Sequence, residues 1–187
     1  MEADKTMTLR EVKAFFYKQN GFPSDGGVSR KKWAPVACRD LKVYLPNFKW
    51  RRKALPYHDL HHILTGYEFR PTGEFQIAAW EFAAGKYPNI YTTLFCIPLV
   101  SLGAIFIPIR TFKAFVIGRR SKTLYSINDY DALLERKVSD VQKEIIPSGE
   151  IHPCLDDYIK YLKLVTCSFF VLISPVLIPL TLFIGLR

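Results

Sequence analysis

Residues 58–74 read HDLHHILTGYEFRPTGE, and this stretch decides how we expect the chain to fold. The histidine-rich segment is expected to be helical and to end at Gly66, because glycine commonly follows the last residue of a helix. A loop over residues 65–73 then leads into a second helix, expected over residues 74–84. A short connection lets the second helix return antiparallel to the first. The stretch therefore predicts two antiparallel helices with polar side chains between them.

Four side chains of this stretch are candidate metal ligands. Residues four apart on a helix point in nearly the same direction, so His58 and His62 can bind one ion together. Asp59 lies about 100° further round the helix and can reach the ion from the side. The antiparallel return brings Glu74 to the same point. Two imidazoles and two carboxylates suit Zn²⁺ and also tolerate Fe²⁺ or Mn²⁺.

Other uses of a histidine cluster stay open at this point. In H-E-x-x-H peptidases a glutamate follows the first histidine as the base, whereas Asp59 is one methylene shorter and a third ligand is missing. H-D phosphohydrolases need a further histidine upstream, and residues 1–57 contain none. Membrane di-iron hydroxylases use H-x-x-H-H boxes, and residues 58–62 match this pattern. These enzymes need many more histidines than the four present in this chain. A polar surface turn is the plain alternative. His61 is expected to point away from the ion, as a supporting or surface group.

The composition indicates an anionic partner. The chain has 187 residues, a formal net charge of +9 and 49% hydrophobic residues, so it can bury a core or enter lipid. Such a basic chain binds nucleic acid or an anionic membrane. Its basic residues flank hydrophobic segments rather than a reading helix, so we expect anionic membrane lipid and no nucleic acid. The four cysteines lack C-x-x-C spacing, which argues against a disulfide framework or a cysteine zinc site.

The end of the sequence is a hydrophobic run. Residues 164–186 carry no charge and lie between Lys163 and Arg187. About 20 apolar residues in a helix cross a hydrocarbon core of roughly 30 Å. The run is therefore expected to be a C-terminal membrane anchor, either one helix or a hairpin bent at Pro175 and Pro179. A buried helix of a soluble core is the alternative.

A second uncharged run covers residues 87–109 and contains three prolines and a glycine, which weaken a single straight span. Basic clusters precede it at residues 49–53 and follow it at residues 110–122. One crossing would put one of these clusters on the outer face, against the positive-inside rule. We therefore expect the run to re-enter the membrane, to lie at its interface or to line a lipid tunnel. The metal domain is then expected on the cytoplasmic side of a bacterial-type cytoplasmic membrane.

The other segments are also expected to be helical. Thr8 and Glu11 form a capping box, and Asn20-Gly21 ends that helix. The apolar face of this first helix is expected to consist of Leu9, Val12, Phe15 and Phe16. A further helix is expected around residues 35–45.

One more helix is expected after residue 128, capped by Asn128 or Asp129. Its apolar stripe is Tyr130, Leu134, Val138, Val141 and Ile145. No convincing alternating strand pattern is present, so the predicted fold class is all-α. We expect a helical domain over residues 1–149, with the metal site between two antiparallel helices. Residues 150–187 are expected to form a hydrophobic membrane anchor.

The metal motif resembles that of the coenzyme Q biosynthesis protein 4 family. The family's signature is H-D-x-x-H, then eleven residues, then E, and this chain matches it at His58, Asp59, His62 and Glu74. Residues 9–25, 80–88 and 118–146 are also similar to flanking parts of the family, so the resemblance covers roughly residues 8–147. Two features depart from the family. Residues 112–117 replace its tryptophan-rich lead-in, and the hydrophobic tail after residue 150 is an addition.

The resemblance implies a role in ubiquinone biosynthesis. The family is associated with removing the C1 carboxylate of a polyprenylated aromatic ring, coupled to hydroxylation there, and with organising the other biosynthetic proteins. This implies a metal-dependent decarboxylase or oxidative decarboxylase, with the run 87–109 as an apolar bed for the isoprenoid tail. The alternative is a non-catalytic lipid-binding scaffold that holds a structural metal and presents the quinone precursor to other quinone-biosynthesis proteins. Neither Glu74 nor Asp59 is singled out for proton transfer, no catalytic residue is assigned, and a homodimer is left open.

Overall fold

The computed structural model describes residues 6–26, 33–38, 41–85 and 87–185, with side chains described outside 33–38, 41–46 and 176–185. Its elements in chain order are α1 (Leu9–Gln19), β1 (Trp33–Cys38), β2 (Leu41–Pro46), α2 (Lys49–Thr65), α3 (Pro71–Ala84), α4 (Ile90–Phe106), α5 (Pro108–Gly118), the 3-10 turn η1 (Leu124–Ser126), α6 (Tyr130–Leu134), α7 (Val138–Ile145) and α8 (Leu155–Gly185). The expected helical character is confirmed, with one hairpin as the exception among these elements.

The hairpin corrects the helix expected around residues 35–45. β1 and β2 pair antiparallel, with Val36 opposite Val43 and Cys38 opposite Leu41. β-branched and aromatic residues favour strands, and a proline at position 35 opposes a helix interior. The pattern was too short and too irregular to reveal the pairing before the structure was known.

The first helix agrees with its expected caps but not with all of its expected face. Thr8 and Glu11 form the capping box, and Asn20 caps the C-terminal end. Leu9, Val12 and Phe16 are buried as expected, whereas Phe15 is 55% exposed and Tyr17 is buried instead. Tyr17 replaces Phe15 in the core because its hydroxyl group has a buried partner, described below.

The helix expected after residue 128 is in fact two helices. Asp129 caps α6 as expected, through a hydrogen bond from the N–H of Ala132. The chain then leaves helical geometry where it pairs with the segment before α1: Leu9 N–H donates to Arg136 O, and Val138 N–H donates to Met7 O. These long-range backbone bonds replace those that a continuous helix would make.

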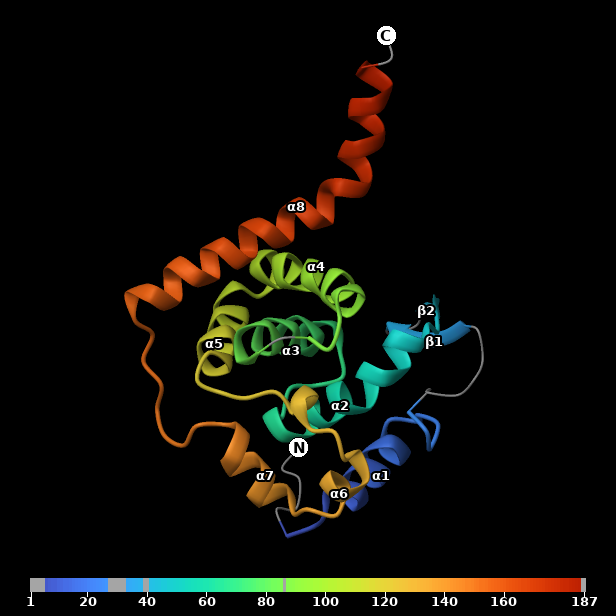
Figure 1. Cartoon of the computed structure of the whole chain (residues 1–187), viewed down its shortest axis with the longest axis vertical. Helices are drawn as coiled ribbons and strands as arrows, with labels where there is room; N and C mark the ends of the chain where they lie inside the picture. The colour runs from blue at the N-terminus through green and yellow to red at the C-terminus, as the bar shows by residue number, and fades with distance from the viewer. Residues whose placement is uncertain (1–5, 27–32, 39–40, 86, 186–187) are drawn as a thin grey trace.

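Helix α3 lies at the centre of the domain, with α4, α5 and α2 around it (Figure 1). Ile77, Ala78, Ala79 and Trp80 are buried within it. Helix α5 approaches α3 so closely that a Cβ atom on Gly118 would lie 2.4 Å from the carbonyl oxygen of Trp80. Small side chains at this crossing therefore set the distance between the two helices.

The run 87–109 is divided between two helices, as its prolines indicated. Helix α4 ends at Phe106, and Pro108 begins α5 after Ile107, whose φ of −141° is not helical. Helix α8 passes over α4 and then turns away from the domain (Figure 1). Its segment Leu155–Pro175 is long and apolar enough to cross a membrane, by length and composition, with a mean hydropathy of 1.3.

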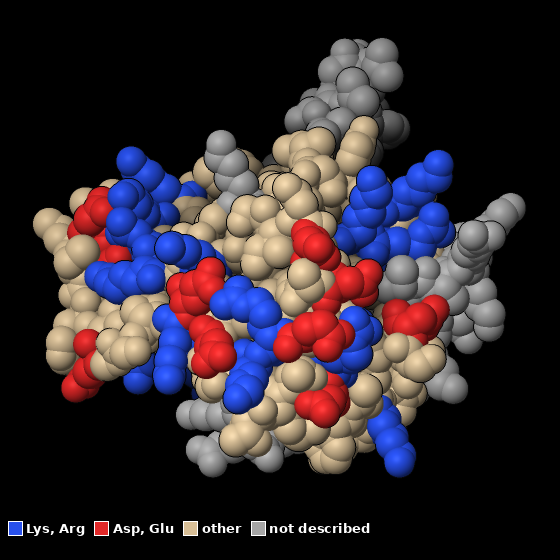
Figure 2. Space-filling view, turned by 60° about the horizontal axis from the view of Figure 1, so that its bottom comes forward, with Lys and Arg blue, Asp and Glu red and all other residues tan. Residues whose placement is uncertain are grey.

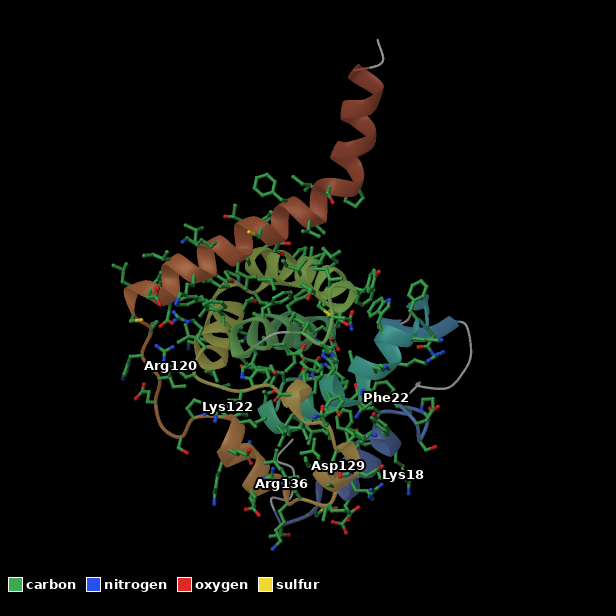
Figure 3. The ribbon with its side chains drawn as sticks, viewed as in Figure 1. Lys18, Phe22, Arg120, Lys122, Asp129 and Arg136 are labelled. Atoms are coloured by element: carbon green, nitrogen blue, oxygen red, sulfur yellow. The ribbon has the colours of Figure 1, made fainter. Side chains whose placement is uncertain are left out.

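The face opposite α8 is charged. Figure 2 brings this side forward and shows acidic and basic side chains next to one another across its middle. Two short ion pairs join exposed residues there, Arg10–Glu135 and Arg136–Glu144, each at 2.6 Å. Figure 3 places Lys18, Asp129 and Arg136 at the same end of the molecule. Most of the exposed large apolar side chains lie instead on α4, α5 and α8.

The close crossing of α3 and α5 predicts the effect of a methyl group at position 118. Gly118→Ala should lower the free energy of unfolding by about 3 kcal/mol, at the upper end of overpacking costs, because the Cβ atom meets backbone rather than a flexible side chain. Gly66→Ala is the comparison, since Gly66 has open space and a φ of 75°, which costs about 1 kcal/mol. Urea unfolding of the detergent-solubilised protein measures both. Equal losses would contradict the close approach.

Candidate metal centre

The site forms where the C-terminal half of α2 meets the first turn of α3. Gly66 ends α2 in the left-handed conformation, and its N–H donates to His62 O. Pro71 opens α3, a position where its missing N–H costs nothing. Gly73 allows the connecting loop to pack against this first turn, because a Cβ atom there would collide with the carbonyl oxygen of Glu68. Glu74 is thereby held in the first turn of α3, facing α2.

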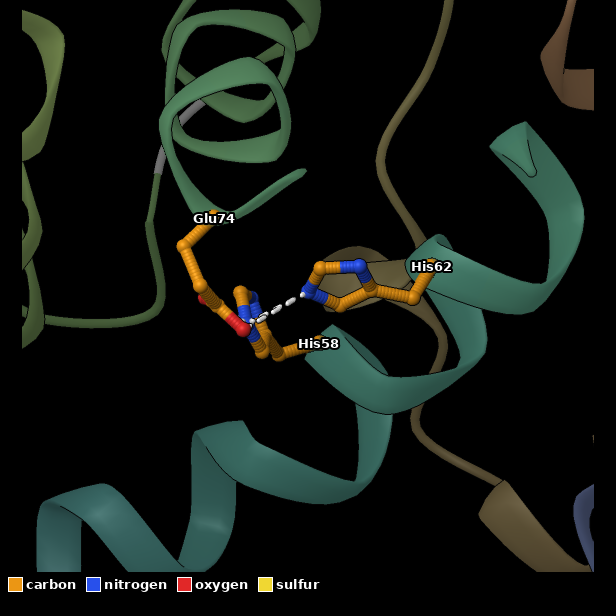
Figure 4. A group of neighbouring side chains, drawn as sticks. All are labelled: His58, His62 and Glu74. Atoms are coloured by element: carbon orange, nitrogen blue, oxygen red, sulfur yellow. Dashed lines mark hydrogen bonds and ion pairs between the residues drawn. The ribbon is translucent and has the colours of Figure 1, made fainter. Parts of the chain in front are cut away.

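Three predicted ligands converge (Figure 4). The Nε2 atoms of His58 and His62 are 3.2 Å apart. The carboxylate of Glu74 lies 3.3 Å from His58 Nε2 and 3.4 Å from His62 Nε2. One ligand atom from each residue lies within 4.8 Å of the other two, so this group can hold a metal ion.

The other ring nitrogen of each histidine has an acceptor. His62 Nδ1 lies 3.0 Å from the carbonyl oxygen of Tyr67, to which it donates as N–H. His58 Nδ1 lies 3.2 Å from both carboxylate oxygens of Glu81 and is in the same position to donate. Placing each proton on Nδ1 leaves the lone pairs of both Nε2 atoms directed at the Glu74 carboxylate. Such outer acceptors are the usual means of orienting metal-binding histidines.

Glu81 is the residue that the sequence analysis missed. Its side chain is fully buried, and its carboxylate accepts hydrogen bonds from the hydroxyl groups of Tyr87 at 2.8 Å and Tyr125 at 2.7 Å. It also accepts from the Nδ1–H groups of His58 and His61. One buried carboxylate thus joins α2, α3 and η1. A signal was available, because Glu81 is the one acid in the apolar stretch FQIAAWEFAA and buried acids need partners.

His61 faces away from the three converging ligands, as the sequence led us to expect. Its Nδ1–H donates to Glu81 Oε1 at 2.6 Å, and its Nε2 accepts the N–H of Leu124 at 2.9 Å. Both ring nitrogens are therefore used, and the ring is fixed as a neutral tautomer. Complete burial lowers the pKa of His61, in agreement with this assignment. His61 supports Glu81 and is not itself a ligand in this arrangement.

Asp59, the fourth predicted ligand, is buried but not part of the converging group. Its carboxylate accepts a hydrogen bond from the hydroxyl of Tyr17 on α1. Burial raises the pKa of Asp59, and the nearby imidazoles of His58 and His62 act in the opposite direction. Its role as a ligand stays a prediction, since its present hydrogen bond directs the carboxylate towards α1.

The electrostatics of the site favour a cation. Burial acts to lower the pKa of His58, but the carboxylates of Glu81 and Glu74 outweigh it and raise the pKa well above its ordinary value. Burial acts to raise the pKa of Glu74, and the imidazoles of His62 and His58 outweigh it and hold the pKa far below its ordinary value. The site therefore attracts positive charge to the point where the Nε2 atoms and Glu74 meet.

The three converging side chains differ in their exposure to solvent. The side chain of Glu74 is 34% exposed and that of His58 is 17% exposed, whereas His62 is fully buried. The ring of Phe69 covers His62, with ring centroids 4.0 Å apart. Glu74 is therefore the member of the converging group that is most exposed to solvent.

Comparison with protein-family models, with curated proteins and with solved structures gives no match for this chain. The resemblance to the coenzyme Q biosynthesis protein 4 family therefore rests on the motif and the flanking stretches quoted above.

Removing the charge of Glu81 should destabilise the protein. The two carboxylate oxygens of Glu81 accept hydrogen bonds from four donors, and in Glu81→Gln an amide N–H₂ group replaces one of these oxygens. Breaking a buried ionic network of this kind costs about 3–5 kcal/mol. Glu68→Gln is the matched control, because Glu68 is exposed and such changes stay within about 0.5 kcal/mol. Urea unfolding of the metal-free protein measures the difference. A loss for Glu81→Gln no larger than that of the control would contradict its role as the hub of the network.

Proposed function

We propose that His58, His62 and Glu74 bind a divalent metal ion, and that this ion is zinc. The observation that carries the proposal is the convergence of two Nε2 atoms and a carboxylate while each Nδ1 atom has an acceptor of its own. Three groups that present lone pairs to one point are stable together only with positive charge between them. A metal ion supplies this charge; without the ion, a second proton on His58, whose pKa the carboxylates of Glu81 and Glu74 raise, can supply it instead.

The spacing of the ligand atoms supports zinc. Ligands at about 2.0–2.1 Å from a tetrahedral ion lie about 3.3–3.4 Å from each other. The two Nε2 atoms are 3.2 Å apart, Glu74 Oε2 is 3.3 Å from His58 Nε2, and the other oxygen, Oε1, is 3.4 Å from His62 Nε2, so each histidine is at this spacing from one carboxylate oxygen. Two imidazoles and a carboxylate are also a ligand set of catalytic zinc sites, in which the fourth position stays open for water or substrate. Asp59 can fill that position only by giving up its hydrogen bond with Tyr17.

We further propose that the protein is a metal-dependent, membrane-associated protein of ubiquinone biosynthesis. In this role it acts on the polyprenylated aromatic ring precursor in C1 decarboxylation, in which the carboxylate leaves as CO₂ and a proton takes its place; hydroxylation at C1 would also require dioxygen and a reductant, because zinc has no redox chemistry. Support comes from the match of the motif to the signature H-D-x-x-H, eleven residues, E, and from an acidic ligand that is accessible at the protein surface. A bound zinc ion acts as a Lewis acid on a carboxylate or phenolate. Glu74 holds the ion, and Glu81 keeps His58 in the tautomer that binds it.

The second candidate is a lipid-binding scaffold that organises the quinone biosynthetic enzymes, with a structural metal. The observation that favours it is the depth of the network behind the ligands. His58 is tied through Glu81 to Tyr87 and Tyr125, so an ion at this point would join α2 to α3 and to the segment after α5. Structural zinc sites stabilise folds in this way.

Loss of the Glu74 carboxylate should remove the metal. Removal of a hydrogen-bond partner of a metal-binding side chain already lowers metal affinity about 10–100-fold, and loss of the metal-binding side chain itself lowers it further. We therefore expect Glu74→Gln to lose at least this much affinity for Zn²⁺, measured by competition with a fluorescent chelator and by elemental analysis of the purified protein. Glu68→Gln, with the same change at an exposed position, should bind as the wild type does.

Two outcomes of that assay are decisive. Unchanged zinc affinity in Glu74→Gln, with retained helical content, would refute the site. The same measurement on Asp59→Asn assigns the fourth position. A loss equal to that of Glu74→Gln makes Asp59 a ligand, and retained zinc leaves the position to water or substrate.

Metal removal separates the enzyme from the scaffold. Under the enzyme proposal, chelator-treated protein loses ring decarboxylation, and added Zn²⁺ restores it. Product formation from a polyprenyl hydroxybenzoate precursor in vesicles, followed by mass spectrometry, measures this. Under the scaffold proposal, the untreated protein forms no product but binds the precursor. Metal removal then lowers the thermal unfolding midpoint without abolishing precursor binding.

A further inference from the structure

Helix α8 is fixed to the domain at its first turn. The side chain of Asp157 is 1% exposed and pairs with Arg119 and Arg120 of the α5 end, at 2.8 Å in each case. It also accepts the N–H of Cys154, at 2.8 Å. Figure 3 places Arg120 close to this turn. A carboxylate buried between two guanidinium groups holds the start of α8 against α5.

A second attachment lies three turns further along α8. The hydroxyl of Ser168 is buried, accepts the N–H of Ser101 at 2.9 Å and donates to the carbonyl oxygen of Ile97 at 2.5 Å. Residues 97 and 101 are four apart on α4, so the Ser168 hydroxyl bridges a carbonyl and an N–H that pair with each other in a regular helix. Between the two attachments, Tyr161 packs between the rings of Phe112 and Phe115. One face of α8, from Asp157 to Ser168, is thus occupied by the domain.

The opposite face of α8 is exposed and apolar. Its side chains, with their exposed fractions, are Leu155 (75%), Tyr158 (53%), Ile159 (45%), Leu162 (66%), Phe170 (64%) and Ile173 (39%). The charged residues Asp156, Lys160 and Lys163 follow one edge of the helix at spacings of four and three residues. This division into a packed face, an apolar face and a charged edge is that of a helix lying at a membrane surface.

Helix α4 exposes a similar face. It contains no charged residue, and it presents Ile90, Tyr91, Leu94, Phe95, Ile105 and Phe106 to the surroundings, each at least 46% exposed. Helices α4 and α8 lie against each other at the end of the molecule away from the ion-paired face (Figure 1). Together they form an apolar surface, here called the α4–α8 layer, that is larger than the scattered exposed side chains usual in soluble proteins.

We infer that the α4–α8 layer lies in one leaflet of an anionic bilayer, with residues 155–175 of α8 parallel to the membrane plane rather than crossing it. A crossing would carry Asp156, Asp157, Lys160 and Lys163 into hydrocarbon, or would break the attachments at Asp157 and Ser168. The plane-parallel position keeps both attachments and places the charged edge among the headgroups.

The charges around the layer identify its occupant as lipid. Arg110 and Lys113 of α5, and Lys160 and Lys163 of α8, are exposed beside the apolar faces, which matches anionic headgroups. Trp50 stacks on Tyr91 and contacts Phe95 at the other end of α4, which is the aromatic composition found at membrane interfaces. This inference rests on the membrane association proposed above but not on the metal.

The test is a measurement of depth along α8. The full-length protein is placed in vesicles of equimolar phosphatidylcholine and phosphatidylglycerol, and single nitroxide labels are attached at Leu155→Cys, Leu162→Cys and Phe170→Cys. Native cysteines are replaced by serine in these variants, and the exposed native Cys167 provides a further site without a new substitution. Power-saturation spectroscopy with oxygen and a water-soluble nickel complex then gives the depth of each label. Phe106→Cys tests α4, and Phe15→Cys on α1, 55% exposed, is the aqueous control.

The expected result is one common depth for the three α8 labels, a lipid-exposed α4 label nearer the headgroups because α4 lies on the domain side of α8, and the Phe15→Cys label in water. A spanning helix would instead change depth by about 22 Å between positions 155 and 170, at about 1.5 Å per residue. That gradient would overturn the inference. Water exposure at all α8 and α4 labels would also overturn it, in favour of a protein partner. Zinc binding measured on the same samples is independent of depth, so failure here is distinguishable from failure of the metal site.

Should the cysteine-free background lose helical content, the wild-type protein labelled at Cys154 and Cys167 alone gives the same comparison. Both residues are exposed and they bracket three turns of the helix. Equal depths support the plane-parallel position, and a difference of about 20 Å overturns it.

Discussion

The buried carboxylate of Glu81 is the interaction on which the rest of the centre depends. It lies inside the domain without solvent contact and accepts hydrogen bonds from two imidazoles and two phenols. Burial acts to raise the pKa of Glu81, but the charge of His58 and the hydrogen bonds from His58 and His61 outweigh it and hold the pKa well below its ordinary value. A carboxylate kept ionised in this way fixes the donors around it, since each loses a strong bond by turning away. The orientation of His58 follows directly.

The chain connects this constraint to the ligand cluster through helical spacing. His58 and His62 are four residues apart on α2, and Glu74 and Glu81 are seven residues apart on α3, so each pair shares a face of its helix. The inner acid, Glu81, accepts from His58 Nδ1, and the outer acid, Glu74, faces both Nε2 atoms. One helix therefore supplies both the ligand and the group that orients another ligand. Glu74 can therefore turn towards an ion, while the hydrogen bonds of Glu81 hold that residue in place.

The parts of the structure that could be predicted from the sequence are those decided by local chemistry. The capping box at Thr8, the stop at Gly66 and the convergence of His58, His62 and Glu74 all depend on residues within about 20 positions of each other. Apart from the β1–β2 hairpin, whose strands are close in sequence, the parts that were missed depend on distant partners. Tyr125 reaches Glu81 from 44 residues away, and the break between α6 and α7 follows from pairing with the segment at Met7. The hydrophobic pattern of one segment does not reveal a partner that lies far away in the sequence.

Asp59 shows how local spacing and a distant partner can predict different roles for one residue. Its place one residue after His58 made it a candidate ligand, yet its carboxylate faces Tyr17, a residue whose burial the pattern of α1 did not indicate. A residue next to His58 on α2 can direct its side chain either to the proposed metal site or to the core behind it. The position of a hydrogen-bond partner, here Tyr17, decides between the two. The hydrogen bond of Tyr17 thus ties α1 to α2 directly behind the histidines.

The proposed site and the proposed membrane surface are joined through the residue after Glu74. The ring of Phe75 is stacked with that of Phe106, with centroids 6.4 Å apart, and Phe106 is 67% exposed at the end of α4. Glu74 itself is the most exposed of the three proposed ligands. With the α4–α8 layer in lipid, the contact between Phe75 and Phe106 would bring the proposed site close to the bilayer. Under the proposed function, this proximity would let a precursor keep its isoprenoid tail in hydrocarbon close to the proposed ligands, which would avoid the large cost of bringing the tail into water.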